Sequence, residues 1–362
     1  MVYFTAREVD DVLMDPASTS RPIKVSAAAV ARAAGVSPAT VSYVMNGQQG
    51  VSDETRRHVV KVANELGFRP SAGKDAPDPR LTRVVGMILP NIVNPMYTGW
   101  AQSIITATSE QGFDVFVATS QDDADTLAQT ANTLAARNVD GVVIAAALSD
   151  DSRALRTLRQ HRIPYVYLSR RSNHVPGDFV GIDDDAAATQ LMHHVLGHGY
   201  TELATVIGPR FSTASLAREE AFVRTAKAAG VTIAGQRKVS TRLNSEGGLT
   251  AAKRLLASER PPRAIVCGSD EIAIGVMEYA LAIGLSIPED LAVVGSDGLP
   301  HSRSSLIGMT TIVQPVRQMA ERAVELLLGQ ITDPRSTYTH TVCDHRLYLG
   351  TSCGCPPPST AR

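Results

Sequence analysis

The stretch SAAAVARAAGVSPATVSYVMNG, from Ser26 to Gly47, predicts two short helices joined by a tight turn. Ser26 is suited to cap the first helix, and Gly35 is suited to end it, because glycine readily adopts the left-handed conformation that often follows a helix. Ser37 then caps a second helix whose first residue, Pro38, lacks an N–H that would have no partner there. Two helices joined in this way form the helix-turn-helix arrangement, which places its second helix in the DNA major groove.

The second helix has an apolar side and a polar side. Val41, Val44 and Met45 are suited to face a core, which leaves hydroxyl and amide side chains for phosphate oxygens and base edges. A third helix is expected from Ser52. Between residues 24 and 83, nine Lys or Arg stand against five Asp or Glu, a local excess of four positive charges in a chain of net charge −1. This excess suits a DNA-binding module, although an ordinary three-helix cap with a polar face would have the same pattern.

The remainder of the 362-residue chain is too long for one compact core. From Val84 onward, short apolar strands alternate with helices, as in parallel βαβ units. Two such series imply two doubly wound lobes, with a ligand cleft at the carboxyl ends of their strands. The expected buried strands are VVGMIL (84–89), FDVFVA (113–118), GVVIAAA (141–147), PYVYL (164–168), LATVIG (203–208), AIVCG (264–268) and LAVVG (291–295).

Several functional classes lack support in the sequence. No apolar signal-peptide region opens it and no apolar run is long enough to span a bilayer, so a cytoplasmic protein with reduced thiols is expected. There is no Walker loop, no G-x-S-x-G and no G-x-G-x-x-G after a strand, so enzymatic activity is not expected. A secreted binding protein of the same two-lobed fold would lack the helical module.

Two groups of histidine and cysteine residues are candidate metal ligands. His193, His194 and His198 lie in one expected helix, where His194 and His198 share a face. No H-E-x-x-H motif or nearby carboxylate set accompanies them, so surface histidines are the favoured interpretation, and no metal or other cofactor is expected. Cys353 and Cys355 form a C-x-C, too close for an ordinary disulfide and too few for a closed zinc site.

Residues 30–70, VARAAGVSPATVSYVMNGQQGVSDETRRHVVKVANELGFRP, resemble the DNA-binding domain of the LacI/GalR family of bacterial transcription regulators. The family pattern is V-A-x-x-A-G-V-S-x-x-T-V-S-x-V-x-N-G, then V-S-x-x-T-R and L-G-[YF]-x-P. The resemblance continues through VGMILPNIVNPMY (85–97), AREEAF (217–222) and SDEIAIGVMEYALAIGLSIPEDLAVVGSDG (269–298). It implies an N-terminal all-α helix-turn-helix domain joined to an α/β two-lobed, periplasmic-binding-protein-like (type I) effector domain.

Five segments are expected along the chain. They are a flexible N-terminal extension (1–22), the helix-turn-helix DNA-binding domain (23–70), a hinge or linker (71–83), a two-lobed effector-binding and dimerisation domain (84–350) and a C-terminal tail (351–362). The N-terminal lobe would comprise about residues 84–182 and 315–341, and the C-terminal lobe about residues 183–314 and 342–350.

The resemblance also assigns DNA contacts. Pro38, Ala39 and Tyr43 occupy the positions that contact bases, and the third of these is usually arginine. Arginine donates two hydrogen bonds to guanine, whereas tyrosine offers one hydroxyl, so an unusual operator is expected. Phosphate contacts are implied for six polar side chains: Ser26, Ser37, Thr40, Ser42, Asn46 and Thr55.

The linker departs from the family. Members usually place a hinge helix there, with leucines that wedge into the minor groove. Here the segment is SAGKDAPDPRLTR (71–83), and Pro77 stands where the wedging leucine belongs. Because proline opposes a helix interior, a weak or absent hinge helix is expected, with minor-groove contacts left to Lys74, Arg80 and Arg83.

By the same resemblance, Arg218 and Asp297 match a ligand-binding arginine and aspartate. The other expected effector-binding residues are Met96, Tyr97, Ser169, Arg242 and Ser269. The function implied is a repressor of carbohydrate-related genes, controlled by a sugar-like effector between the lobes and bound as a homodimer to a pseudo-palindromic DNA operator. The alternatives are an effector-independent or activating regulator, or one responding to an anionic or nucleobase-like ligand. No membrane partner is expected.

Overall fold

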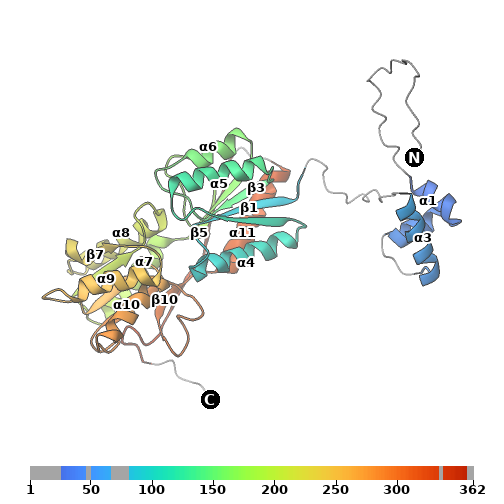
Figure 1. Cartoon of the computed structure of the whole chain (residues 1–362). Coiled ribbons are helices and arrows are strands. Elements are labelled where there is room, and N and C mark those ends of the chain that lie inside the picture. The colour runs from blue at the N-terminus through green and yellow to red at the C-terminus, as the bar shows by residue number, and fades with distance from the viewer. Residues whose placement is uncertain (1–25, 46–49, 67–80, 334–336, 357–362) are drawn as a thin grey trace, which may run out of the picture. The chain divides into compact units, whose positions relative to one another are not determined.

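The computed structural model describes residues 26–45, 50–66, 81–333 and 337–356. The chain divides into two compact units, residues 1–79 and 80–362, here called the helical unit and the effector unit (Figure 1). Among the described residues, no helix has both the length and the apolar character needed to cross a membrane.

The helical unit contains α1 (Ala27–Ala34), α2 (Pro38–Met45) and α3 (Asp53–Glu65). The Ser26 hydroxyl accepts a hydrogen bond from the Ala29 N–H at 3.2 Å, and Gly35 ends α1 with a φ of 65°. The Ser37 hydroxyl accepts from the Thr40 N–H at 3.1 Å. These contacts confirm the two predicted N-caps and the glycine turn, because each places the expected side chain or backbone conformation at a helix end.

Small and β-branched side chains pack the three helices together. Val41 and Val44 are buried, as predicted, and Val59 packs with them from α3. The cluster consists of Val30, Ala31, Ala34, Val41, Val44, Val59, Val62 and Ala63. Several sequence-based expectations fall outside the described residues: the side chain of Met45, and the whole of Asn46, Lys74, Pro77 and Arg80.

The effector unit contains two six-stranded sheets with helices packed on them (Figure 1). The N-terminal lobe has the strand order β11-β5-β4-β3-β1-β2, and all its pairs are parallel. Its elements are β1 (Val84–Leu89), α4 (Pro95–Ser109), β2 (Asp114–Thr119), α5 (Ala124–Ala136), β3 (Gly141–Ile144), α6 (Arg153–Gln160), β4 (Tyr165–Leu168), β5 (Asp178–Ile182), α11 (Val316–Thr332) and β11 (His340–Cys343).

The C-terminal lobe has the strand order β12-β10-β9-β8-β6-β7, in which only β12 runs antiparallel to its neighbour. Its elements are α7 (Asp184–Gly197), β6 (Leu203–Ile207), α8 (Thr213–Ala228), a 3₁₀ turn (Gly235–Arg237), β7 (Lys238–Ser240), α9 (Ser245–Leu256), β8 (Ala264–Cys267), α10 (Asp270–Ala282), β9 (Ala292–Asp297), β10 (Thr310–Val313) and β12 (Arg346–Tyr348). The two doubly wound lobes predicted from the strand and helix alternation are thereby confirmed.

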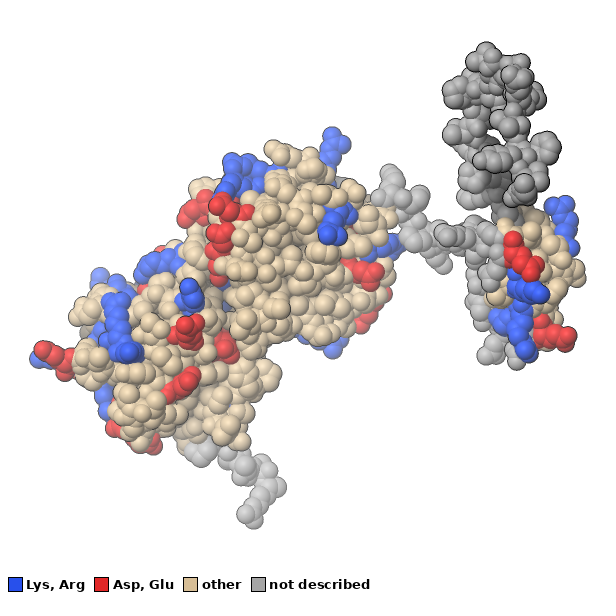
Figure 2. Space-filling view, in the orientation of Figure 1, with Lys and Arg blue, Asp and Glu red and all other residues tan. Residues whose placement is uncertain are grey.

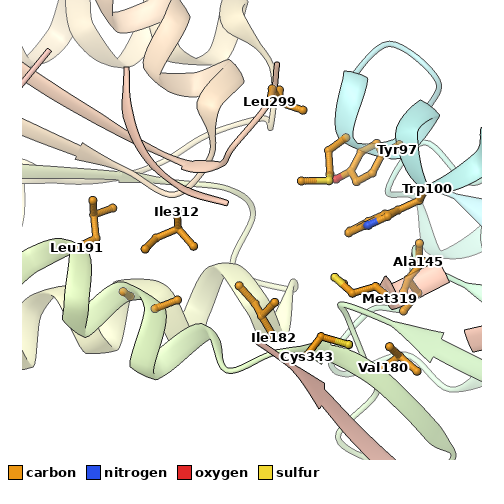
Figure 3. Close-up of a cluster of buried hydrophobic side chains, with 14 of the residues drawn as sticks. Tyr97, Trp100, Ala145, Val180, Ile182, Leu191, Leu299, Ile312, Met319 and Cys343 are labelled. Atoms are coloured by element: carbon orange, nitrogen blue, oxygen red, sulfur yellow. The ribbon is translucent and has the colours of Figure 1, made fainter. Parts of the chain in front are cut away.

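The chain passes between the lobes after β5, after β10 and after β11. One hydrophobic cluster therefore draws side chains from both lobes, with Val180 and Met319 from the first, and Leu191 and Ile312 from the second. Figure 3 shows these side chains together with Ile182, which ends β5. The shared cluster holds the lobes together on the side where the chain crosses.

The structure corrects one detail of the sequence-based expectations. FDVFVA was expected to be a buried strand, but β2 is an edge strand that pairs only with β1, and Phe116 is 37% exposed. At the C-terminal end of the chain, β11 pairs with β5 of the N-terminal lobe through Cys343. The Ser352 hydroxyl donates a hydrogen bond to the Val293 carbonyl of the C-terminal lobe.

Candidate DNA-binding helix and effector cleft

One side of α2 is open to solvent while its other side is buried. The side chains of Pro38, Ala39, Ser42 and Tyr43 are exposed, and that of Tyr43 is 48% exposed. Positions 39, 42 and 43 share a helix face because they are three and four residues apart. The side chains that the resemblance assigns to base contacts therefore stand on a surface of α2 that the described residues of this unit leave exposed.

The hydroxyl candidates lie at helix N-termini. Ser37 and Thr40 place their hydroxyl oxygens 2.9 Å apart, and Ser52 and Thr55 do the same at 2.8 Å. Each pair shares one hydrogen bond between two hydroxyl groups, so the second proton of each pair can be donated to another acceptor. Helix N-termini favour anions, since their first N–H groups point outward along the helix dipole. The pairs therefore suit contact with phosphate oxygens.

The effector cleft lies between the lobes, at the carboxyl ends of the parallel strands. It is lined by Asn94, Met96, Tyr97, Trp100, Ser169, Arg170, Ser212, Ala214, Ser215, Arg218, Leu243, Asp297 and Gln314. Five residues expected from the sequence line it: Met96, Tyr97, Ser169, Arg218 and Asp297. Asn94, Trp100 and Gln314 also line the cleft and were not expected from the sequence, although Asn94 belongs to the segment VGMILPNIVNPMY.

Two other expected effector residues do not line the cleft. Arg242 is exposed to solvent, and its neighbour Leu243 lines the cleft in its place. Ser269 is buried, but its hydroxyl accepts a hydrogen bond from the Ile272 N–H at 3.2 Å and caps α10. A serine committed to a cap has its acceptor already in use, so its placement here is explained by helix formation.

Arg218 is held from three directions at the C-terminal side of the cleft. Its Nε donates to Asp184 Oδ1 at 2.8 Å, its Nη1 donates to the Gly268 carbonyl at 2.6 Å, and its Nη1 lies 3.7 Å from Asp297 Oδ1. Burial raises the pKa of Asp297 well above its usual range, and the Arg218 guanidinium offsets only part of this shift. Burial likewise raises the pKa of Asp184.

Arg170 forms a matching contact on the N-terminal side. It is 3% exposed, donates to Asp122 Oδ1 at 2.6 Å and donates to the Tyr97 hydroxyl at 2.7 Å. Ser169 precedes it with a φ of 66°, a left-handed conformation that is uncommon for a residue with a Cβ and turns the chain sharply after β4. Burial raises the pKa of Tyr97 to about 12, although Arg170 acts in the opposite direction.

Two buried polar atoms of the cleft have no hydrogen-bond partner within the described part of the chain. They are Nε1 of Trp100, a donor, and Oε1 of Gln314, an acceptor. The amide nitrogen of Gln314 is already engaged, since it donates to Asp297 Oδ1 at 3.0 Å. An unsatisfied buried polar group is unfavourable, so the pair suits a ligand that both accepts and donates hydrogen bonds.

Hydrogen bonds also join the two lobes directly. Asn94 Nδ2 donates to the Leu243 carbonyl at 3.0 Å, and the Ser149 N–H donates to the Phe211 carbonyl at 2.9 Å. The lobes are therefore closed upon each other around the cleft. Figure 2 shows Lys and Arg interspersed with Asp and Glu over the visible face of the effector unit.

Comparison with known families matches both units. Residues 28–71 match the family described as bacterial regulatory proteins, lacI family, and residues 192–353 match a periplasmic binding protein-like domain.

Individual relatives extend this match over most of the chain. The transcriptional regulator DegA of Bacillus subtilis is 31% identical over 81% of this chain and 88% of its own length. The transcriptional regulator MalR of Streptomyces coelicolor is 31% identical over 92% of this chain and 98% of its own length. The structure of a transcriptional regulator CelR–cellobiose complex is 27% identical, has a TM-score of 0.69, and aligns over 91% of this chain and 99% of CelR.

Proposed function

This chain belongs to the lacI family of bacterial regulatory proteins and is a DNA-binding transcription regulator, and we propose that it represses carbohydrate-related genes under the control of a neutral, sugar-like effector. The effector would bind in the cleft between the lobes and change the affinity for operator DNA. We further propose that the protein acts in the cytoplasm. It would bind DNA as a homodimer, because two copies of α2 are needed for the two half-sites of a pseudo-palindrome.

The proposal of a neutral effector, and not an anionic one, rests on the charge balance of the cleft. Its two buried guanidinium groups, those of Arg170 and Arg218, are each already paired with a carboxylate, Asp122 and Asp184 respectively. Asp297 adds a further acidic group next to Arg218. A cleft with no excess of positive charge gives little attraction to a phosphate or a sugar acid, since any such anion would have to displace an existing ion pair.

The uncharged polar groups of the cleft support a sugar. Trp100 Nε1 and Gln314 Oε1 supply one unused donor and one unused acceptor, and a sugar hydroxyl can accept from the first and donate to the second. The Trp100 and Tyr97 rings, whose centroids lie 5.7 Å apart, offer apolar surface for the C–H side of a sugar ring. The CelR complex contains cellobiose, and its similarity to this chain agrees with this class of ligand.

The DNA contacts proposed for the helical unit rest on exposure and on helix ends. Pro38, Ala39 and Tyr43 would contact bases, and the Ser37–Thr40 and Ser52–Thr55 hydroxyl pairs would donate to phosphates. The absence of arginine at position 43 predicts an operator in which a guanine contact common in the family is replaced by a contact to the tyrosine ring or hydroxyl.

The test uses the purified full chain and DNA from its own upstream region, followed by fluorescence anisotropy across a salt series. Preference over scrambled DNA, with affinity that falls steeply with salt, is expected for a sequence-specific regulator. Neutral mono- and disaccharides, sugar phosphates and nucleobases are then added in turn. A shift in operator affinity with a neutral saccharide supports the proposal. A shift with phosphates or nucleobases alone contradicts the effector class, and no shift with any of them supports an effector-independent regulator.

A further inference from the structure

Four potential metal ligands meet at one point in the C-terminal lobe, away from the cleft residues described above. Two of them are the histidines at the end of α7: His194 lies in its last turn, and His198 follows the helix as its C-cap. The other two are Cys353 and Cys355, in the segment that follows β12. The ligand atoms of all four residues lie within 4.8 Å of one another.

The distances between these atoms fit a single ion. His194 Nε2 lies 3.3 Å from both Cys353 Sγ and His198 Nε2, and Cys355 Sγ lies 3.5 Å from the Nε2 atom of each histidine. Zinc binds histidine nitrogen at about 2.0–2.1 Å and cysteine sulfur at about 2.3 Å, so neighbouring ligand atoms of a zinc tetrahedron stand about 3.3–3.8 Å apart. These four separations lie in this range.

We propose that His194, His198, Cys353 and Cys355 form a structural zinc site. Two thiolates and two imidazoles in a tetrahedral set select zinc over magnesium or calcium, which prefer oxygen ligands. Four protein ligands leave no position for a reactive water, so the site is structural and not catalytic. In the sequence, the histidine pair and the C-x-C lie far apart, and each alone is only half of a site.

The surroundings of the cysteines support this assignment. Thr310 Oγ1 lies 3.0 Å from Cys353 Sγ and accepts a hydrogen bond from the Gly350 N–H at 2.9 Å. The Gly350 carbonyl also lies 3.0 Å from this hydroxyl, so the single Thr310 proton can be donated either to that carbonyl or to a Cys353 thiolate. A hydrogen bond to the thiolate would orient and stabilise a metal-bound sulfur. The Tyr200 hydroxyl donates to the Cys353 carbonyl at 3.2 Å, which fixes the backbone of the C-x-C segment.

The residue between the two cysteines also suits the site. Gly354 has a φ of 97°, a left-handed conformation that glycine adopts without strain. The turn at this residue brings both sulfur atoms to the same histidine pair, since Cys353 contacts His194 and Cys355 contacts both histidines. A side chain at position 354 would be strained and would begin 3.4 Å from the Tyr200 hydroxyl.

Zinc at this position would join parts of the chain that are far apart in sequence. It would fasten the segment after β12 to the end of α7, close to the hydrogen bonds of Ser352 with Val293 and Thr310. Because the ligands come together only in the folded lobe, the free energy of zinc binding adds to the stability of that lobe. The role assigned to the ion is therefore to anchor this segment.

The test measures zinc in the full chain, purified under reducing conditions and passed through gel filtration after incubation with zinc. Elemental analysis is expected to find one zinc per chain, and replacement by Co²⁺ should give the visible bands of a tetrahedral site with thiolate ligands. Cys355→Ser and His198→Gln should lose the metal. Two matched controls should keep it: His193→Gln, which changes an exposed neighbour on α7, and Cys343→Ala, which changes a cysteine in the other lobe.

A thermal melt guards against variants that lose zinc only because they unfold. Wild type and His193→Gln should melt at a lower temperature after treatment with a strong chelator and recover on addition of zinc, whereas folded Cys355→Ser should respond to neither. The proposal is wrong if wild type retains no zinc or cobalt. It is also wrong if both ligand variants retain the metal, if chelation leaves the melting temperature unchanged, or if mass spectrometry finds Cys353 and Cys355 joined in a disulfide under reducing conditions.

Discussion

The side-chain amide of Asn94 in the N-terminal lobe donates a hydrogen bond to the main-chain carbonyl of Leu243 in the C-terminal lobe, at 3.0 Å. The same amide group uses its oxygen to accept from the Met96 N–H at 2.9 Å, as the N-cap of α4. Asn94 therefore couples the start of a helix that carries Tyr97 and Trp100 to the opposite wall of the cleft. An asparagine suits this position because it offers a donor and an acceptor on one short side chain.

Asn94→Asp separates these two roles. Aspartate keeps the acceptor that caps α4 but replaces the donor with an oxygen that repels the Leu243 carbonyl. We expect the effector affinity to fall about tenfold, because one buried hydrogen bond is lost and a repulsion is added. The N-cap of α4 should be kept, so the helix should remain folded. Calorimetric titration with the saccharide identified in the operator assay measures the affinity, and hydrogen exchange of residues 241–244 reports the opening of the lobes.

The control for this variant is Asn91→Asp, in the same loop, where the side-chain oxygen accepts from the Val93 and Asn94 N–H groups within the loop. Its effector affinity and its exchange at residues 241–244 should remain those of wild type. Equal affinity in Asn94→Asp and wild type would show that the bridge to Leu243 does not contribute to closure around the ligand.

Arg218→Met tests the buried charge cluster. Methionine fills much of the same volume but leaves Asp184 and Asp297 without their buried cation. Removing one partner of a buried ion pair destabilises a protein by about 3–5 kcal/mol, because the remaining charge stays desolvated. We expect a loss of this size in urea unfolding of the full chain, together with loss of effector binding. Arg224 lies on α8 like Arg218 and forms an exposed ion pair with Asp185 of α7, so Arg224→Met should cost less than about 1 kcal/mol.

The helix caps were predictable from sequence because they depend on neighbouring residues. Ser26, Gly35 and Ser37 lie within four residues of the groups they satisfy, and so does Asp183, whose carboxylate accepts from the Ala186 N–H at 2.9 Å. Asp184 and Asp185 follow in the first turn of α7, where acidic side chains suit the helix dipole. The alternation of strands and helices could likewise be predicted from the sequence, because apolar runs mark the strands that the lobes bury.

The cleft was only partly predictable. Arg218 and Asp297 belong to motifs, but Arg170 acquires its role from Asp122 and Tyr97, which reach it from other elements of the lobe. No local pattern distinguishes such an arginine from an exposed one. The histidine and cysteine cluster shows the same limit, since its two halves lie about 155 residues apart in sequence, from His198 to Cys353, and only the fold of the C-terminal lobe brings them together.

The raised pKa of Asp297 predicts how stability depends on pH. A carboxyl group with a higher pKa in the folded than in the unfolded protein binds more protons when folded, so its contribution to stability is full below the unfolded pKa of about 3.9 and is lost as pH rises through the folded pKa. Within that window the loss approaches about 1.4 kcal/mol per pH unit. Asp297→Asn removes this dependence and keeps an acceptor for Gln314.

The measurement is the difference in free energy of unfolding between Asp297→Asn and wild type, from urea curves at several pH values above 4. This difference should grow in favour of the variant as pH rises. Asp185→Asn, which replaces an exposed carboxylate, is the matched control. A difference that stays flat across the range would mean that Arg218 keeps Asp297 ionised in the folded protein, and that burial does not dominate its pKa.

Tyr43 is the position at which the helical unit departs most from its family, and its side chain can be changed with little effect on folding because it is 48% exposed. Tyr43→Ala should weaken binding to the operator by about 1–3 kcal/mol and leave binding to scrambled DNA unchanged, since a base contact carries sequence preference and a phosphate contact does not. The salt dependence should also stay unchanged, because no charge is removed. Val60→Ala, at an exposed position on α3, serves as the control for a lost apolar side chain. Anisotropy titrations on both DNAs decide the matter: an equal loss on operator and scrambled DNA would place Tyr43 against the phosphate backbone and away from the bases.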